Sequence, residues 1–307
     1  MSDTELREHI HKVSQWLGTH YFVTPSARAL SPRLDMTIAF NETSLPGAKT
    51  ITAISGANGV GKSTFAHSWA HAYHRRKVAG LKLRNGFPQL DVRGGMADAV
   101  PVVWLNLQAQ AKIAELDVQI LNYLGRGLSG TIRDMTLRAV RALEDHRVSV
   151  LVIDDVHLLK LSKSSGRDVL DHLKHLNTEL GEVGGSMVLI GANLESTDLV
   201  YDPQITARLQ LHNLQPLGAT TAQGRSRWKD TVADMEADLL PLLPHAKAGQ
   251  LTQNAGALHD LTGGYVGELA TMLKQATVAA LLSRTGLIDL DLLRQLPVSY
   301  RAERATT

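Results

Sequence analysis

The stretch AISGANGVGKSTFAH, residues 53–67, decides the fold of this chain. Residues 56–63 within it match the pattern G-x-x-x-x-G-K-[ST], with a β-rich run before the match and a helical pattern after it. Glycines allow backbone N–H groups to converge on phosphate oxygens at the positive end of the following helix. The stretch therefore predicts a P-loop that binds a nucleotide, and its context argues against an idle glycine-rich turn.

The chemistry of a P-loop assigns roles to these residues. Lys62 neutralises the β- and γ-phosphates, and the Ser63 hydroxyl can ligate Mg²⁺. The residues that we expect to contact the nucleotide here are Gly56, Asn58, Gly59, Val60, Gly61, Lys62, Ser63 and Thr64.

The pattern around the P-loop predicts an α/β fold. Strands are expected at 50–55, 100–107, 148–154 and 186–193, with a weaker candidate at 209–214. The third and fourth runs are almost continuously apolar, as in parallel strands that are buried on both faces. Helical patterns separate the runs, so we predict a doubly wound, five-stranded parallel sheet.

The chain is expected to divide into an ATPase core and a helical appendage. We predict a helical extension at 1–20, an α/β core at 21–215, a small helical lid domain at 216–300 and a tail at 301–307. Residues 80–99 are glycine-rich and aperiodic, and a stretch of that length is expected to form a functional or mobile loop.

Acidic and polar residues at strand ends complete the predicted site. Asp154 ends a buried strand, where it can hold the Mg²⁺ shell, and Asp155 can orient the attacking water. Asn193 follows the next strand and can position water or contact the γ-phosphate, although asparagine is also common in turns. Arg208 precedes the fifth strand and can act as an arginine finger on a neighbouring subunit; the alternative is a solvated surface arginine.

This order of parts resembles the AAA+ ATPases, and within them the transposition ATPases of the TniB/TnsC type. The stretches that carry the resemblance are LVIDDVHLL, DVLDHLKHLNTEL, DPQITARL and LTGGYVGELATMLKQATVAAL. It implies an ATP- and Mg²⁺-dependent oligomer, either a ring or a helical filament, that forms on double-stranded DNA and recruits or activates a transposase. It also implies that Thr24 and Pro25 lie near the adenine.

Two positions depart from the pattern of that family. Asp155 stands where the family usually has Glu, and the shorter side chain retracts the carboxylate from the water. Glu268 stands where a second sensor arginine is usual, and a carboxylate there would repel a γ-phosphate. Both departures predict that ATP binds and assembles subunits while hydrolysis is slow.

Candidate DNA contacts lie in LGRGLSGTIRD, residues 124–134. Protein–DNA contacts are made mostly to phosphates, by basic side chains, hydroxyls and backbone N–H groups. Arg126, Thr131 and Arg133 offer such groups, and the resemblance places this region against DNA; an ordinary exposed loop is the alternative. Lys160 and Lys163 form a weaker second candidate.

Composition indicates where in the cell the protein is expected and which sites it can form. The chain has 307 residues, no cysteine and a net charge of +2 at pH 7, so neither disulfides nor thiolate metal sites are available. No signal peptide or membrane-spanning run is recognisable, and a cytoplasmic, nucleoid-associated protein is expected. Membrane partners are not expected.

Other functions are compatible with the same motifs. An AAA+ loader or initiator that delivers a replication factor to DNA would share the chemistry and differ only in its partner. A P-loop phosphotransferase without a DNA role is the third hypothesis, and it gives no reason for Arg208 or for the long helical C-terminal part.

Overall fold

The computed structural model describes residues 3–92, 95–108, 112–158 and 164–296. These residues divide into two compact units. The sheet unit comprises residues 30–56 and 62–214. The helical unit comprises residues up to 29, the segment 57–61 and residues from 215 onwards.

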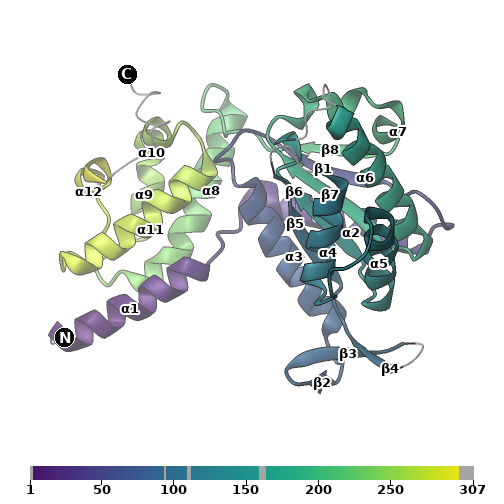
Figure 1. The fold of residues 1–307 in the computed structure, drawn as a ribbon. Helices are drawn as coiled ribbons and strands as arrows, with labels where there is room; N and C mark the ends of the chain where they lie inside the picture. Colours follow the sequence, from purple (N-terminus) through teal and green to yellow (C-terminus); the bar gives the residue numbers. More distant parts are fainter. Residues whose placement is uncertain (1–2, 93–94, 109–111, 159–163, 297–307) are drawn as a thin grey trace. The chain divides into compact units, whose positions relative to one another are not determined.

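The sheet unit is built on five parallel strands. Their order across the sheet is β5 (Val102–Asn106), β6 (Val150–Asp154), β7 (Ser186–Gly191), β1 (Ile51–Ser55) and β8 (Leu209–Asn213). Every residue of β1, β6 and β7 is buried, which agrees with the apolar runs in the sequence. The predicted five-stranded parallel α/β sheet is therefore confirmed (Figure 1).

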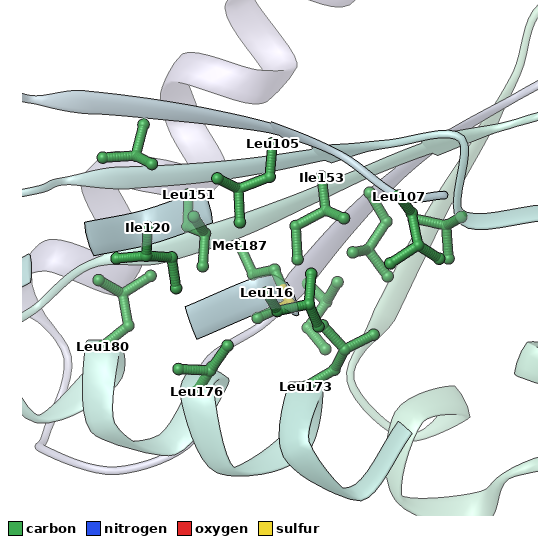
Figure 2. Packing of buried hydrophobic residues seen from close by; sticks show 14 of the residues in the cluster. Leu105, Leu107, Leu116, Ile120, Leu151, Ile153, Leu173, Leu176, Leu180 and Met187 are labelled. Carbon is green, nitrogen blue, oxygen red and sulfur yellow. The ribbon is translucent and has the colours of Figure 1, made fainter. Parts of the chain in front are cut away.

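Helices connect the strands and cover the sheet. In chain order they are α2 (Pro25–Thr43), α3 (Lys62–Val78), α4 (Ile113–Tyr123), α5 (Ile132–Asp145) and α6 (Ser164–Glu182). Figure 2 shows side chains of α6 and α4 packed against those of β5, β6 and β7; the labelled examples include Leu173, Leu176, Leu116, Ile120, Leu105, Leu151 and Met187. Full burial of one such side chain stabilises the fold by about 1.5–3 kcal/mol.

A buried polar network joins three of these helices. Asp117 on α4 is fully buried, and its carboxylate accepts a hydrogen bond from the Thr136 hydroxyl on α5 at 2.5 Å. The second oxygen of Asp117 lies 2.8 Å from Nε2 of His172 on α6, which is itself buried. Buried polar groups stabilise a fold only when they are paired, so this network fixes how the three helices pack.

The segment between α3 and β5 corrects one expectation. Residues 80–99 were expected to form an aperiodic loop, but they contain β2 (Leu83–Arg84), β3 (Phe87–Val92) and β4 (Gly95–Asp98) in an antiparallel sheet. The first two strands meet at Asn85–Gly86, and Asn-Gly is the strongest short hairpin signal in a sequence. Strands of two to six residues are too short to show a clear hydrophobic period in the sequence.

Short elements follow β6 and β7. They are the 3₁₀ helices η1 (Val156–Leu158), η2 (Leu194–Ser196) and η3 (Asp198–Tyr201), and the short helix α7 (Pro203–Thr206). The Asp202 carboxylate caps α7 by accepting from the backbone N–H groups of Gln204 and Ile205.

The helical unit has its own core. It contains α1 (Asp3–Thr19), α8 (Ala222–Leu239), η4 (Leu240–Leu242), α9 (Gln250–Gln253), α10 (Ala255–Thr262), α11 (Val266–Leu282) and α12 (Leu290–Gln295). Trp228 is buried in this core and donates its indole N–H to the carbonyl of Ala255 at 2.6 Å. Val13 and Leu17 of α1 belong to the same core.

The domain limits at residues 20, 215 and 300 stay predictions, and the expected tail at 301–307 lies outside the described residues. Among the described helices, none combines the length and apolar character that a membrane crossing requires.

Candidate nucleotide site

The P-loop backbone has the conformation that its glycines were expected to allow. Gly56, Gly59 and Gly61 have φ of 143°, 88° and 92°, a region that side chains with a Cβ rarely adopt. Helix α3 starts at Lys62, directly after the last of these turns. Its N-terminus therefore presents the backbone N–H groups of the first turn and the positive end of the helix dipole, as anion binding requires.

The predicted metal ligand Asp154 is the last residue of β6. Its side chain is buried, and one carboxylate oxygen accepts the backbone N–H of Asp155 at 2.8 Å. Oxygen ligands of this kind suit Mg²⁺, which is usually held by one or two carboxylates together with substrate phosphates. In the described parts of the chain, no cluster of three or more His, Asp or Glu side chains could hold a metal alone. Ser63 and Asp154 thus fit a metal that is shared with bound phosphates.

Asp155 differs sharply from its neighbour. It has a left-handed backbone with φ of 60°, and 51% of its side chain is exposed. Its carboxylate lies 3.9 Å from Nδ1 of His157, outside hydrogen-bonding distance. The side chain is therefore held by neither burial nor a hydrogen bond to that histidine.

A polar latch joins the ends of β1 and β8 to the turn after β7. The Ser55 hydroxyl donates to the Glu195 carboxylate and accepts the backbone N–H of Leu194 at 2.8 Å. The second Glu195 oxygen accepts from the Asn213 amide at 3.0 Å. These hydrogen bonds hold the pKa of Glu195 below its usual value, and the hydrogen bond from Ser55 has the largest effect. The sequence did not reveal Glu195, because its partners lie far away in the chain.

The predicted sensor residue, Asn193, directly precedes the latch residues Leu194 and Glu195. Asn193 has a left-handed backbone with φ of 47°, an exposed side chain, and a carbonyl that accepts from the Ser196 backbone and hydroxyl. Its position follows the end of β7, which lies between β6 and β1 in the sheet. Lys62, Ser63, Asp154, Asp155 and Asn193 therefore all follow or end strands at the carboxyl edge of one parallel sheet.

Arg208 lies at the opposite edge of that sheet. It directly precedes β8, and its carbonyl accepts the backbone N–H of Ile51, the first residue of β1, at 2.8 Å. Its exposed guanidinium donates to the carbonyl of Gln204 at 3.1 Å. Four residue steps along β1 separate Ile51 from Ser55, or roughly 13 Å at the rise of a strand. An arginine side chain starting at this edge does not span that distance to its own P-loop.

The helical unit contains a direct contact with the P-loop. The backbone N–H of Gly267, in the first turn of α11, donates to the carbonyl of Gly59 at 3.0 Å. A Cβ atom on Gly267 would lie only 2.6 Å from that oxygen. A glycine is therefore required for this approach. Glu268, the departure noted in the sequence, is the next residue of the same turn.

Thr24 and Pro25, expected near the adenine, form the start of α2. The buried Thr24 hydroxyl accepts the backbone N–H of Ala27 at 3.2 Å, and Pro25 is the first helical residue. This arrangement is the usual helix N-terminus, in which a threonine cap precedes a proline. Their contact with adenine stays a prediction.

The expected DNA contacts have partners of their own. Arg126 pairs with Asp145 at 3.1 Å, with both side chains largely exposed. Thr131 caps α5 by accepting from the backbone N–H of Asp134, while its own N–H and hydroxyl donate to the Asp134 carboxylate. Arg133 is exposed in the first turn of α5. An exposed ion pair contributes only about 0–1 kcal/mol, so Arg126 can exchange Asp145 for a phosphate at little cost. Lys160 and Lys163 lie outside the described residues.

Comparison with known proteins decides the family. The model of a family described as "Bacterial TniB protein" matches residues 19–218, which is more than half of the chain. The chain belongs to the TniB family. The resemblance to the TniB/TnsC type that the sequence indicates is thereby confirmed, and no curated protein matches this TniB-family sequence.

Solved structures show the same fold at low identity. The TniB-family chain is similar to Aeropyrum pernix ORC2 (TM-score 0.60, 14% identity, covering 95% of this chain and 70% of that one). It is similar to Cdc6p from Pyrobaculum aerophilum (TM-score 0.58, 16% identity, 89% and 67%). It is also similar to a chain of Drosophila ORC bound to DNA (TM-score 0.54, 15% identity, 94% and 64%). The chain thus spans between 64% and 70% of these structures, and it has the AAA+ fold.

Proposed function

We propose that this protein is an ATP-dependent switch that assembles on double-stranded DNA and recruits or activates a transposase. The observation that carries the proposal is the placement of Arg208 and the P-loop at opposite edges of one sheet. An arginine finger so placed meets the γ-phosphate of a neighbouring copy, and ATP then joins the two subunits. Arginine fingers in known NTPases raise the rate by roughly 10³- to 10⁵-fold.

The residues around the nucleotide have separate tasks in this scheme. The P-loop N–H groups and Lys62 bind the phosphates, and Ser63 and Asp154 hold Mg²⁺, which offsets charge on the transferred phosphoryl group. Asp155 orients the attacking water, and Asn193 contacts the water or the γ-phosphate. The short, half-exposed carboxylate of Asp155 supports slow hydrolysis, so that the ATP-bound assembly persists.

Family membership supports the DNA and transposase parts of the proposal. Among the structural neighbours, an ORC chain is described as bound to DNA, which supports DNA as a partner here. A role as a loader of a replication factor would use the same site, and TniB-family membership favours transposition over it. A protein with this role acts on chromosomal DNA in the cytoplasm.

Electron microscopy of the full chain with duplex DNA tests the proposal. Assemblies on DNA are expected with a slowly hydrolysed ATP analogue and not with ADP. Lys62→Ala is expected to abolish nucleotide binding and assembly together. Arg208→Ala is expected to leave nucleotide binding by isolated protomers unchanged and to weaken assembly, because its phosphate lies in the next subunit. Single particles and bare DNA in the presence of the analogue would refute the proposal, and equal loss of nucleotide binding in both variants would place Arg208 in its own site.

A further inference from the structure

The hairpin between α3 and β5 presents apolar side chains to solvent. Phe87 directly follows its two-residue turn and Leu83 lies two residues before that turn; Leu83 and Phe87 are 68% and 59% exposed. Asn85 and Gly86 both have positive φ, as the tight turn requires. Figure 1 shows the hairpin projecting beyond α3, away from the five-stranded sheet. Large apolar residues exposed together on a projecting element are typical of an interaction site.

The charged residues that immediately precede this tip in the sequence are all basic. No Asp or Glu occurs in the sequence between Glu42 and Asp91. Arg75 near the end of α3, and Lys82 and Arg84 on the hairpin, are exposed, and none of the three forms an ion pair within the described residues. Local positive charge of this kind favours a polyanionic partner.

The strand register places charge and apolar surface side by side. Arg84 lies directly opposite Phe87, so both side chains project from the same face of the hairpin. Leu83 lies opposite Pro88 on the other face. A two-stranded ribbon fits the major groove of duplex DNA, where an apolar side chain such as Phe can contact the methyl group of thymine.

We propose that this hairpin is a second DNA-binding element, in which Lys82 and Arg84 bind phosphates and Phe87, on the same face as Arg84, packs in a groove of the duplex. The inference rests on the proposed function, because it extends DNA binding from the loop at 124–134 to a separate part of the chain. Basic side chains at a sheet edge also discourage pairing with another copy. That role does not account for the apolar tip, which would favour such pairing.

The base of the hairpin is fixed to α5. The backbone N–H of Ala99 donates to the Pro88 carbonyl at 2.8 Å, and Nδ1 of His146 lies 2.8 Å from the Asp98 carbonyl. His146 caps the C-terminal end of α5, whose first turn carries Arg133. At 1.5 Å per residue, this 14-residue helix is about 21 Å long. The two proposed contacts are thus attached to opposite ends of one helix.

Fluorescence anisotropy with a labelled duplex tests the inference, using the full chain with a slowly hydrolysed ATP analogue over a range of salt. The double variant Lys82→Ala, Arg84→Ala is expected to flatten the slope of log K against log[salt] by roughly 1.8, since each lost phosphate contact removes about 0.9. Phe87→Ala is expected to weaken binding about tenfold while the slope stays unchanged. The charge-retaining variant Lys82→Arg, Arg84→Lys is expected to keep the slope.

Two matched controls separate the hairpin from general surface effects. Arg227→Ala with Lys229→Ala removes two exposed cations from α8, and Phe40→Ala removes a phenyl ring that is 73% exposed on α2. Neither control is expected to change affinity or slope. If the wild-type protein binds DNA and the hairpin variants bind equally well, the hairpin inference is wrong while the proposed function stands. If the wild-type protein binds no DNA, the proposed function itself fails.

Discussion

Replacing Gly267 with alanine tests whether α11 holds the P-loop in its binding conformation. The Gly267 N–H donates to the Gly59 carbonyl at 3.0 Å, and this carbonyl shares a planar peptide unit with the N–H of Val60. Because the two groups of a trans peptide point in opposite directions, a carbonyl held by α11 directs the Val60 N–H away from α11. We expect that N–H to contact a phosphate.

The magnitude follows from the space around Gly267. An added Cβ would lie 2.6 Å from the Gly59 oxygen and 3.3 Å from its carbonyl carbon, so one of two backbone segments must move. Forcing an extra methyl group into such a contact costs about 1–3 kcal/mol. If the P-loop moves and about 1.4 kcal/mol of that cost appears in binding, ATP affinity falls tenfold.

Gly256→Ala is the matched control for this substitution. Gly256 is also the second residue of its helix, α10, and an added Cβ there meets nothing within 4 Å. We expect that variant to keep its ATP affinity and to gain up to about 1 kcal/mol of stability from the better helix propensity of alanine.

Titration with a fluorescent ATP analogue, combined with thermal unfolding in the absence of nucleotide, separates binding from folding. The expected result is weaker ATP binding by Gly267→Ala alone. If Gly267→Ala and Gly256→Ala bind the analogue with the same affinity, α11 does not position the P-loop.

Three further substitutions test other features of the sheet unit. Asp155→Glu is expected to raise steady-state ATP turnover in the presence of DNA, because the longer carboxylate reaches further toward the water; wild-type turnover of about 10 s⁻¹ or more would contradict slow hydrolysis. Glu195→Gln is expected to lower the melting temperature at neutral pH, and this effect is expected to shrink below about pH 4.5. The lowered pKa of Glu195 means that its carboxylate stabilises the folded state at any pH above the ordinary carboxyl pKa. That stabilisation is lost as the pH falls through the folded-state pKa. A melting-temperature difference that stays constant from neutral to acidic pH would show that the carboxylate charge is not involved. Asp117→Ala is expected to destabilise the protein by roughly 3–5 kcal/mol in chemical unfolding, because the buried His172 loses its carboxylate partner. Asp117→Asn keeps an acceptor oxygen at this position and is expected to cost less. Equal stability of Asp117→Ala and the wild type would mean that the network does not hold the helices together.

The fold could be predicted from the sequence where local pattern and burial agree. The apolar runs before Asp154 and around residues 186–191 form strands that are buried on both faces. Their almost continuously apolar composition follows from this burial. The glycines of the P-loop have the positive φ that their spacing implies. Strand limits differ from the expected ones by a residue or two, because the ends of strands carry few packing constraints.

Features that depend on distant partners could not be predicted in the same way. Glu195 is one acid among many in the sequence, and only the approach of β1 and β8 to the turn after β7 gives it Ser55 and Asn213 as partners. The role of Gly267 likewise depends on the position of Gly59 in space. The hairpin at Asn85–Gly86 is different, since its turn signal was present in the sequence and was outweighed by the glycine content around it.

The opposite placement of Arg208 and the P-loop has a consequence for the geometry of a polymer. A contact between two different surfaces is head-to-tail, so an open polymer has an arginine without a phosphate partner at one end and a bound nucleotide without an arginine at the other. Such a polymer has polarity: it either closes on itself or keeps growing with two chemically distinct ends. A partner that binds only one end of the polymer would therefore be placed in a defined direction along the double helix. This would hold even where the DNA sequence itself has no directional signal.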